Sequence, residues 1–137
     1  MDIFNTVTGF GQKVMGFKEN RFQVTKLKQE VRDVQLFLVY LKKLINTLIK
    51  SKINFCHLPT LIDSVNAFQI FLDKNILGYN TKIVDKAFIE KWPEWYRPEL
   101  KTMINLIMYH IQILQQEYNG YHAIALEKLL GNTNKKK

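Results

Sequence analysis

Apolar residues recur at alternating steps of three and four along two long stretches of the chain, residues 21–52 and 98–130. This spacing places apolar side chains along one face of a helix and is typical of a coiled-coil seam. The first seam contains Val24, Leu27, Val31, Val34, Leu38, Leu41, Ile45 and Leu48, and the second contains Leu100, Ile104, Ile107, Ile111, Leu114, Tyr118, Tyr121 and Ala125. The pattern predicts two long helices that pack through matching stripes.

The second half of the first long helix is apolar on more than one side. Phe37, Leu44 and Ile49 add apolar positions beside the seam. A helix that is apolar over such a wide arc is buried by more than one neighbour. The sequence therefore predicts a helical bundle, and the first long helix is expected to end near residues 51–54.

The stretch between the long helices carries the start and stop signals of shorter helices. Pro59 suits a first helical turn, and Thr60 followed by Asp63 resembles a capping box. The stripe of this helix is Leu61, Val65, Phe68, Leu72 and Ile76, with Gly78 as a stop. A second short helix is expected to begin at Asn80 or Thr81 and to end before Pro93, because proline disfavours helical geometry in the residue before it.

Proline also marks the start of the second long helix, at Pro98. Its stripe continues through Gln116. The dipeptide Asn119-Gly120 leaves two alternatives, because Asn-Gly is a common turn sequence. The helix either ends there or runs on to Leu130.

The N-terminal segment is rich in glycine. Gly9, Gly11 and Gly16 each disfavour a helix, so residues 1–19 are predicted to be a loose arm with at most a short helix. Its phenylalanines, Phe4, Phe10 and Phe17, are expected to dock on the bundle or on another subunit. The predicted fold is all-α, an antiparallel hairpin or bundle of two long helices with one or two shorter helices between them. The bundle spans residues 20–131, and residues 132–137 form a mobile basic tail.

Two tryptophans and a tyrosine lie close to two prolines between the short helices and the last long helix. The residues are Trp92, Pro93, Trp95 and Tyr96, followed by Pro98 at the helix start. A rigid aromatic turn of this kind has two interpretations. It either closes one end of the bundle or presents an exposed corner that binds a protein partner.

The net charge of +8 is unevenly placed along the 137 residues. Residues 13–52 hold ten basic and three acidic side chains, whereas the remainder holds ten and nine. On a helical wheel a basic stripe flanks the first seam, with Glu30 and Asp33 on the other flank. The stripe consists of Arg21, Lys28, Arg32, Lys43 and Lys50. It is either a solvated face or a binding stripe for phosphate, anionic lipid or an acidic partner helix.

Catalytic and metal-binding patterns are not found in the sequence. Cys56 is the sole cysteine, and His57, His110 and His122 do not have the spacing of a helical metal pair. His110 lies near an apolar face and is expected to be a hydrogen-bonded structural imidazole. We therefore expect no enzymatic activity, no catalytic residue, no cofactor, no bound metal and no small-molecule substrate. No apolar run is long enough for a membrane span, and the N-terminus lacks the pattern of a signal peptide.

The central segment contains Leu58-Pro59 at a helix start, then Leu77-Gly78-Tyr79, Asp85, Phe88 and Trp92-Pro93. This order of features resembles the TrbJ-type family of conjugation systems, which are minor-pilin or adhesin-like components of type IV secretion machines. The flanking long helices also suit that family. The chain differs in having no signal peptide and a lysine-rich rather than glutamine-rich first helix. The resemblance implies an exported structural protein, located outside the cytoplasm after removal of a leader; without one the protein would be cytoplasmic.

The sequence therefore predicts a non-enzymatic structural or interaction subunit. Its expected partner is another protein or a second copy of itself. Two alternatives remain at this point. A basic helical protein could bind nucleic acid through non-specific, salt-sensitive contacts, and a small helical immunity or inhibitor protein would bind one cognate partner.

Overall fold

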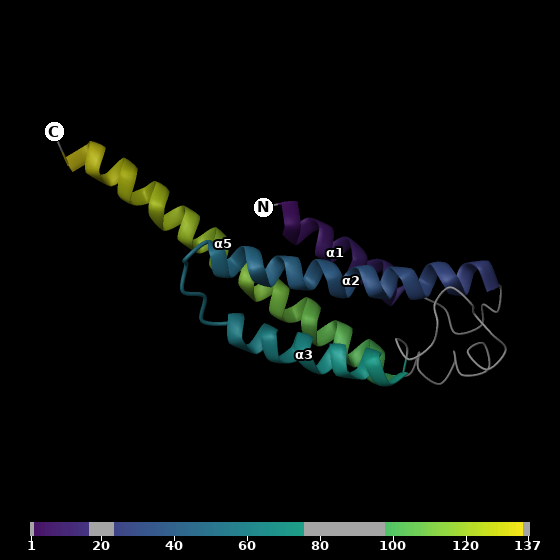
Figure 1. The fold of residues 1–137 in the computed structure, drawn as a ribbon. Helices are drawn as coiled ribbons and strands as arrows, with labels where there is room; N and C mark the ends of the chain where they lie inside the picture. Colours follow the sequence, from purple (N-terminus) through teal and green to yellow (C-terminus); the bar gives the residue numbers. More distant parts are fainter. Residues whose placement is uncertain (1, 17–23, 76–97, 136–137) are drawn as a thin grey trace.

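The computed structural model describes residues 2–16, 24–75 and 98–135, and side chains over most of these ranges (Figure 1). Four α-helices lie in the described ranges: α1 (Asp2–Met15), α2 (Val24–Lys50), α3 (Leu58–Asn75) and α5 (Pro98–Lys135). No strand occurs within them. The prediction of an all-helical fold is confirmed for this part of the chain. The predicted short helix after Asn80 lies outside it.

The helices form a ring in which α1 and α3 each contact both long helices. The principal contacts join α1 to α2, α2 to α3, α3 to α5 and α5 back to α1. In Figure 1, α2 and α5 both begin at the end of the molecule where α3 finishes. The predicted antiparallel hairpin of the two long helices is therefore not confirmed. The seams are instead covered by α1 and α3, and α1 lies in the segment predicted to be a loose arm.

Residues 2–15 form a continuous helix in place of the expected loose arm. Phe4, Val7 and Val14 are almost fully buried against the other helices. Burial of three apolar side chains stabilises α1 by about 1.5–3 kcal/mol each, which exceeds the helix-propensity cost of about 1 kcal/mol per glycine. Tertiary contact therefore outweighs local propensity in this segment.

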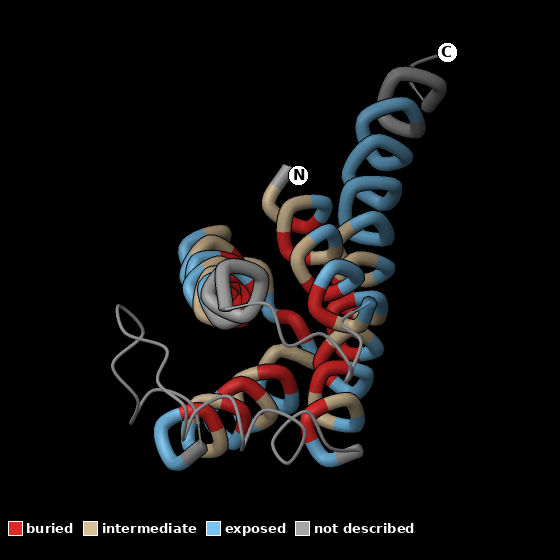
Figure 2. Tube along the Cα trace, turned by 90° about the vertical axis from the view of Figure 1, so that its right-hand side faces the viewer, coloured by how far each residue is buried: buried red, intermediate tan, exposed pale blue. Residues whose placement is uncertain are grey.

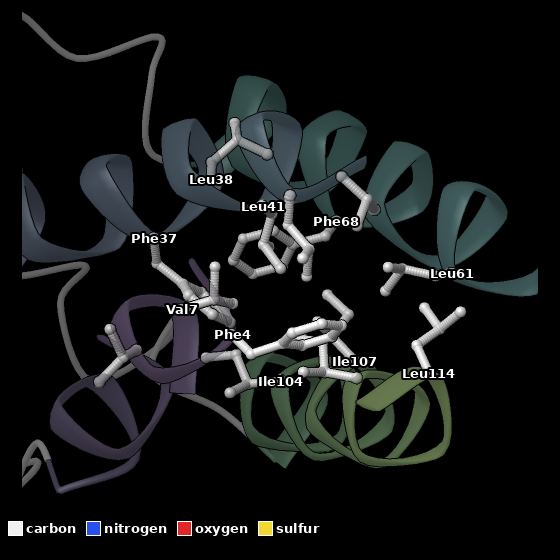
Figure 3. Close-up of a cluster of buried hydrophobic side chains, with 14 of the residues drawn as sticks. Phe4, Val7, Phe37, Leu38, Leu41, Leu61, Phe68, Ile104, Ile107 and Leu114 are labelled. Atoms are coloured by element: carbon white, nitrogen blue, oxygen red, sulfur yellow. The ribbon is translucent and has the colours of Figure 1, made fainter. Parts of the chain in front are cut away.

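Buried apolar side chains from all four helices make up the hydrophobic core (Figure 3). The described members of the predicted seams provide much of it, since Val34, Leu38, Leu41 and Leu48 are buried in α2 and Leu100, Ile104, Ile107, Ile111 and Leu114 in α5. The predicted stripe of α3 is buried at Leu61, Val65, Phe68 and Leu72. Phe37 and Phe68 meet edge to face with ring centroids 5.8 Å apart. The sequence periodicity thus predicted the buried faces of these three helices.

The turn after α2 is closed by side-chain and backbone hydrogen bonds. The Ser51 hydroxyl donates to the carbonyl oxygen of Leu48 at 2.6 Å, and the Lys52 N–H donates to the carbonyl oxygen of Ile49 at 3.3 Å. Lys52 has a φ of 60°, in the left-handed region that helix C-termini favour. The helix ends within a residue of the predicted range, and α3 then begins at Leu58 with Pro59 in its first turn.

The last helix extends well beyond the other three (Figure 1). Its 38 residues would measure ~57 Å at 1.5 Å per residue. Asn119-Gly120 lies inside the helix, and no described glycine has a positive φ. Helical backbone also continues through residues 132–135, where a mobile tail was expected. In Figure 2, buried residues of α5 (red) are confined to the part of the helix that packs on the body, and the part beyond it is exposed (pale blue). Each of residues 119–130 is exposed.

Candidate interaction surface

The point at which α5 leaves the body is fixed by a carboxylate. Glu117 accepts the backbone N–H of Cys56 at 2.9 Å through one oxygen and the N–H of His57 at 3.1 Å through the other. Both N–H groups precede the first turn of α3. A carboxylate at this position stabilises a helix N-terminus, because the first N–H groups lack partners within the helix. Glu117 therefore joins α5 to the start of α3.

Two tyrosines reinforce the same junction. The Tyr121 hydroxyl donates to the carbonyl oxygen of Asn54 at 3.2 Å, and its ring lies edge-on to Phe55 with centroids 5.9 Å apart. The Tyr118 ring contacts Phe4 at 5.9 Å between centroids, and its hydroxyl is 3.1 Å from Nε2 of His122. These contacts set the direction in which the outer half of α5 leaves the body.

A groove of about 430 Å³ lies at this junction. Its lining is largely apolar and comes from the turn after α2 and one side of α5. The lining residues are Ser51, Ile53, Tyr118, Tyr121, His122 and Ala125. Tyr121, His122 and Ala125 belong to the exposed outer half of α5, so the groove borders that part of the helix.

Large apolar side chains are concentrated on the outer half of α5. We define the projecting surface as Tyr121, Ile124, Leu126, Leu129 and Leu130, which are 43%, 52%, 58%, 66% and 56% exposed. Elsewhere in the described chain, exposed large apolar residues are scattered over α2, α3 and the inner half of α5, as is normal for a protein surface. Five exposed large apolar side chains within residues 121–130 make this segment the candidate interaction surface.

Sequence reasoning missed most of the projecting surface. The predicted seam ended at Ala125, so Ile124, Leu126, Leu129 and Leu130 were not selected as site residues. Their signal was present as an apolar run after Asn119-Gly120. The residue types show that these positions are apolar, but the sequence contains no information on whether this chain covers them.

A histidine pair links the start of α3 to the middle of α5. Nε2 of His57 lies 2.7 Å from Nδ1 of His110, which is a hydrogen bond when one ring donates and the other accepts. His110 is 6% exposed. Burial lowers the pKa of His110 below its usual 6.5, and repulsion from a charged His57 lowers it further. The expectation that His110 is a hydrogen-bonded imidazole agrees with this geometry.

Of the predicted aromatic contact residues, only Phe4 and Phe10 lie in the described part of the structure. Phe4 is buried in the core, and the Phe10 ring stacks on Tyr40 with centroids 5.0 Å apart. Phe17 lies outside the described residues, as do Trp92, Pro93, Trp95 and Tyr96. The two alternatives for the aromatic turn therefore stay predictions.

The basic stripe is described at three of its five positions. Arg32, Lys43 and Lys50 are exposed on α2. They fall within about 20° of one another on a helical wheel with 3.6 residues per turn. Arg21 and the Lys28 side chain lie outside the described part of the structure. The described members thus form one line along the helix.

The acidic residues of α2 are buried rather than solvated. Glu30 is 4% exposed and Asp33 is 2% exposed. Asp33 accepts a hydrogen bond from Nε2 of Gln29 at 3.0 Å and forms an ion pair with Lys13 of α1 at 3.4 Å. Because these acids face the interior, the exposed surface of α2 is more basic than its composition suggests.

Groups that could support chemistry are few in the described structure. No cluster of three or more His, Cys, Asp or Glu side chains suited to a metal ion occurs in the described ranges. A second hollow, of about 390 Å³, lies between α1 and α5 and is lined mainly by Thr, Asn, Gln and Met side chains. None of the helices described has the length and apolar content that crossing a bilayer requires.

Comparison of the chain with protein-family models, curated proteins and solved structures finds no match in any of the three.

Proposed function

We propose that this protein is a non-enzymatic structural subunit that acts by binding another protein subunit through the projecting surface of α5. The observation that carries the proposal is the concentration of large apolar side chains, each at least 43% exposed, on a helix that extends beyond the core. Fully burying one such side chain contributes about 1.5–3 kcal/mol. Five of them can therefore supply a substantial part of a binding free energy.

The geometry at the junction supports an interaction role. Glu117 and Tyr121 tie α5 to the loop before α3, so the projecting surface is held in a defined direction. A surface that is preorganised loses less conformational entropy on binding than a flexible one. The long helix is thus suited to present apolar side chains to a partner.

The resemblance of residues 58–95 to the TrbJ-type family suggests the setting of this interaction. We propose a minor component of a conjugative type IV secretion system, in which helical surfaces contact a pilus or channel protein. The helical layout around residues 58–75 is compatible with that role. Co-purification with conjugation proteins, lost on substitution of Leu126 by Asp, would support it, and a conjugation frequency unaffected by deletion of the gene would oppose it.

The interaction is tested by site-specific photo-crosslinking in the native host. A benzophenone amino acid replaces Leu126 in one strain and Ile70 in another, because these side chains are 58% and 56% exposed on different helices. We expect a cross-linked species of defined mass from position 126 and none from position 70. Equal labelling from both positions, or no product from position 126, would contradict the proposed function.

A second candidate function is nucleic-acid binding through α2. The observation that favours it is the exposed line of Arg32, Lys43 and Lys50 combined with burial of Glu30 and Asp33. Such a line would neutralise phosphates without reading sequence, so affinity should fall steeply with salt. Reversal of the three charges to Glu should abolish a DNA or RNA mobility shift. Absence of any shift by the wild-type protein at low salt would eliminate this candidate.

A further inference from the structure

We infer that the contact between His57 and His110 is a pH-sensitive switch, which holds the start of α3 against α5 near neutral pH and opens in acid while the helical core stays folded. The facing nitrogens, Nε2 of His57 and Nδ1 of His110, lie 2.7 Å apart. A hydrogen bond of this length needs one nitrogen that carries a proton and one that does not. This inference does not depend on the proposed function.

The protonation chemistry of imidazole limits the charge that the histidine pair can hold. A neutral ring has one donor and one acceptor nitrogen, whereas a protonated ring has two donors. The hydrogen bond can therefore form when both rings are neutral or when one is charged, but not when both are charged. Two charged rings with centroids 4.7 Å apart would also repel each other. Protonation of both rings thus breaks the contact.

The two rings differ in their access to solvent. His110 lies in the middle of α5 and is 6% exposed, whereas His57 directly precedes α3 and is partly exposed. Burial lowers the pKa of His110 below 6.5, because water cannot solvate the charged ring well. Protonation of His110 is therefore easier after the His57 ring has turned out toward solvent, so a decrease in pH favours the open form.

Glu117 limits how far the junction can open. Its carboxylate accepts the backbone N–H groups of Cys56 at 2.9 Å and His57 at 3.1 Å. These two bonds do not involve the imidazole rings, so they can persist when the histidine contact is lost. We therefore expect the opening to be confined to the His57 side chain and the first turn of α3.

Other titratable side chains of the packed elements are exposed or paired elsewhere. The Tyr109 ring is 5.9 Å from the His110 ring and is 58% exposed. Lys13 of α1 forms its ion pair with Asp33 of α2. The charged residues described in α3 are exposed, namely Asp63, Asp73 and Lys74. Within the described part of the chain, the hydrogen-bonding partner of the His110 ring is thus His57.

Imidazole nitrogen NMR of the full chain, prepared with isotopically labelled histidine, tests the contact. At about pH 7.5, one unit above the usual histidine pKa, a scalar coupling across the hydrogen bond should join Nε2 of His57 to Nδ1 of His110. The coupling should disappear as the pH decreases below 6.5, while the backbone amide signals of Ile104 and Ile107 stay native. Absence of the coupling at the higher pH, or its loss only together with these amide signals, would overturn the inference.

Amide exchange of Leu61 tests the opening, because its N–H donates to the carbonyl oxygen of His57 at 3.2 Å. After correction for the intrinsic effect of pH, its exchange in the wild type should rise in acid by about tenfold, the effect of losing one hydrogen bond. In His57→Gln, the side-chain amide can donate to a neutral His110 or accept from a charged one, so this rise should disappear. His122→Gln is the control and should respond like the wild type. An unchanged acid response in His57→Gln would overturn the switch.

Discussion

At the scale of single residues, the structure brings together groups that lie far apart in the sequence. Glu117 binds backbone N–H groups about 60 positions away, and His110 contacts His57 across 53 positions. No local spacing encodes either contact. The sequence could predict that His110 is near an apolar face, but its partner depends on how α3 and α5 pack.

The histidine pair makes stability depend on pH. Because burial lowers the pKa of His110 below 6.5, the unfolded chain binds a proton under conditions in which the folded chain does not. The free energy of unfolding should therefore fall as the pH decreases from about 6.5 through the lowered pKa of His110. Coulombic repulsion from the neighbouring His57 lowers the pKa of His110 further.

Urea unfolding at a series of pH values measures this effect. His110→Gln should flatten the loss of stability below pH 6.5. The exposed His122→Gln is the control and should follow the wild type. Identical pH profiles for wild type and His110→Gln would show that the pair does not titrate in this way.

The turn after α2 gives a second prediction at this scale. Lys52 adopts a φ of 60°, a conformation that costs an ordinary residue about 1–2 kcal/mol. Lys52→Gly should raise the free energy of unfolding by about 0.5–1 kcal/mol, because glycine adopts this conformation without strain. Lys50→Gly, inside the last helical turn, should lower it by a similar amount. Chemical denaturation compares the two, and destabilisation by Lys52→Gly would refute the explanation.

At the scale of elements, sequence reasoning succeeded where a stripe is long and regular. The buried faces of α2, α3 and the inner half of α5 follow from their apolar periodicity. It failed for α1, because Gly9 and Gly11 lower its helix propensity and the compensating burial of Phe4 and Val7 depends on tertiary contacts. It also left the continuation through Asn119-Gly120 open, since the dipeptide suits a turn and a helix alike.

The glycines of α1 have different roles that substitution can separate. Nothing lies within 4 Å of a Cβ added at Gly9, whereas a Cβ at Gly11 would clash with the Met108 side chain of α5. Gly9→Ala should therefore stabilise the protein by about 0.5–1 kcal/mol. Gly11→Ala should gain less or lose stability, because Met108 must move.

Thermal unfolding of these variants provides the comparison. Met108→Ala should remove the difference between Gly9→Ala and Gly11→Ala, since it removes the clashing atoms. Equal stabilisation by both glycine substitutions in the wild-type background would mean that α1 does not approach α5 at Gly11.

At the scale of the whole molecule, the core is expected to determine stability, whereas the projecting half of α5 is expected to bind a partner. Side chains of all four helices meet in the core, and Ile107 is fully buried there while its neighbour Leu106 is 48% exposed. Ile107→Asp should destabilise the protein by about 4 kcal/mol or more, because it buries an unpaired carboxylate. Leu106→Asp should change stability by less than about 0.5 kcal/mol. Circular dichroism melts distinguish the two, and similar melts would contradict this core.

The division of α5 into a buried inner half and an exposed outer half is the central claim, and hydrogen exchange of the full chain tests it most directly. At low protein concentration, amides of residues 121–130 should exchange much faster than those of residues 104–114, because core packing protects only the inner half. Protection of the outer half that equals that of the core would contradict the account.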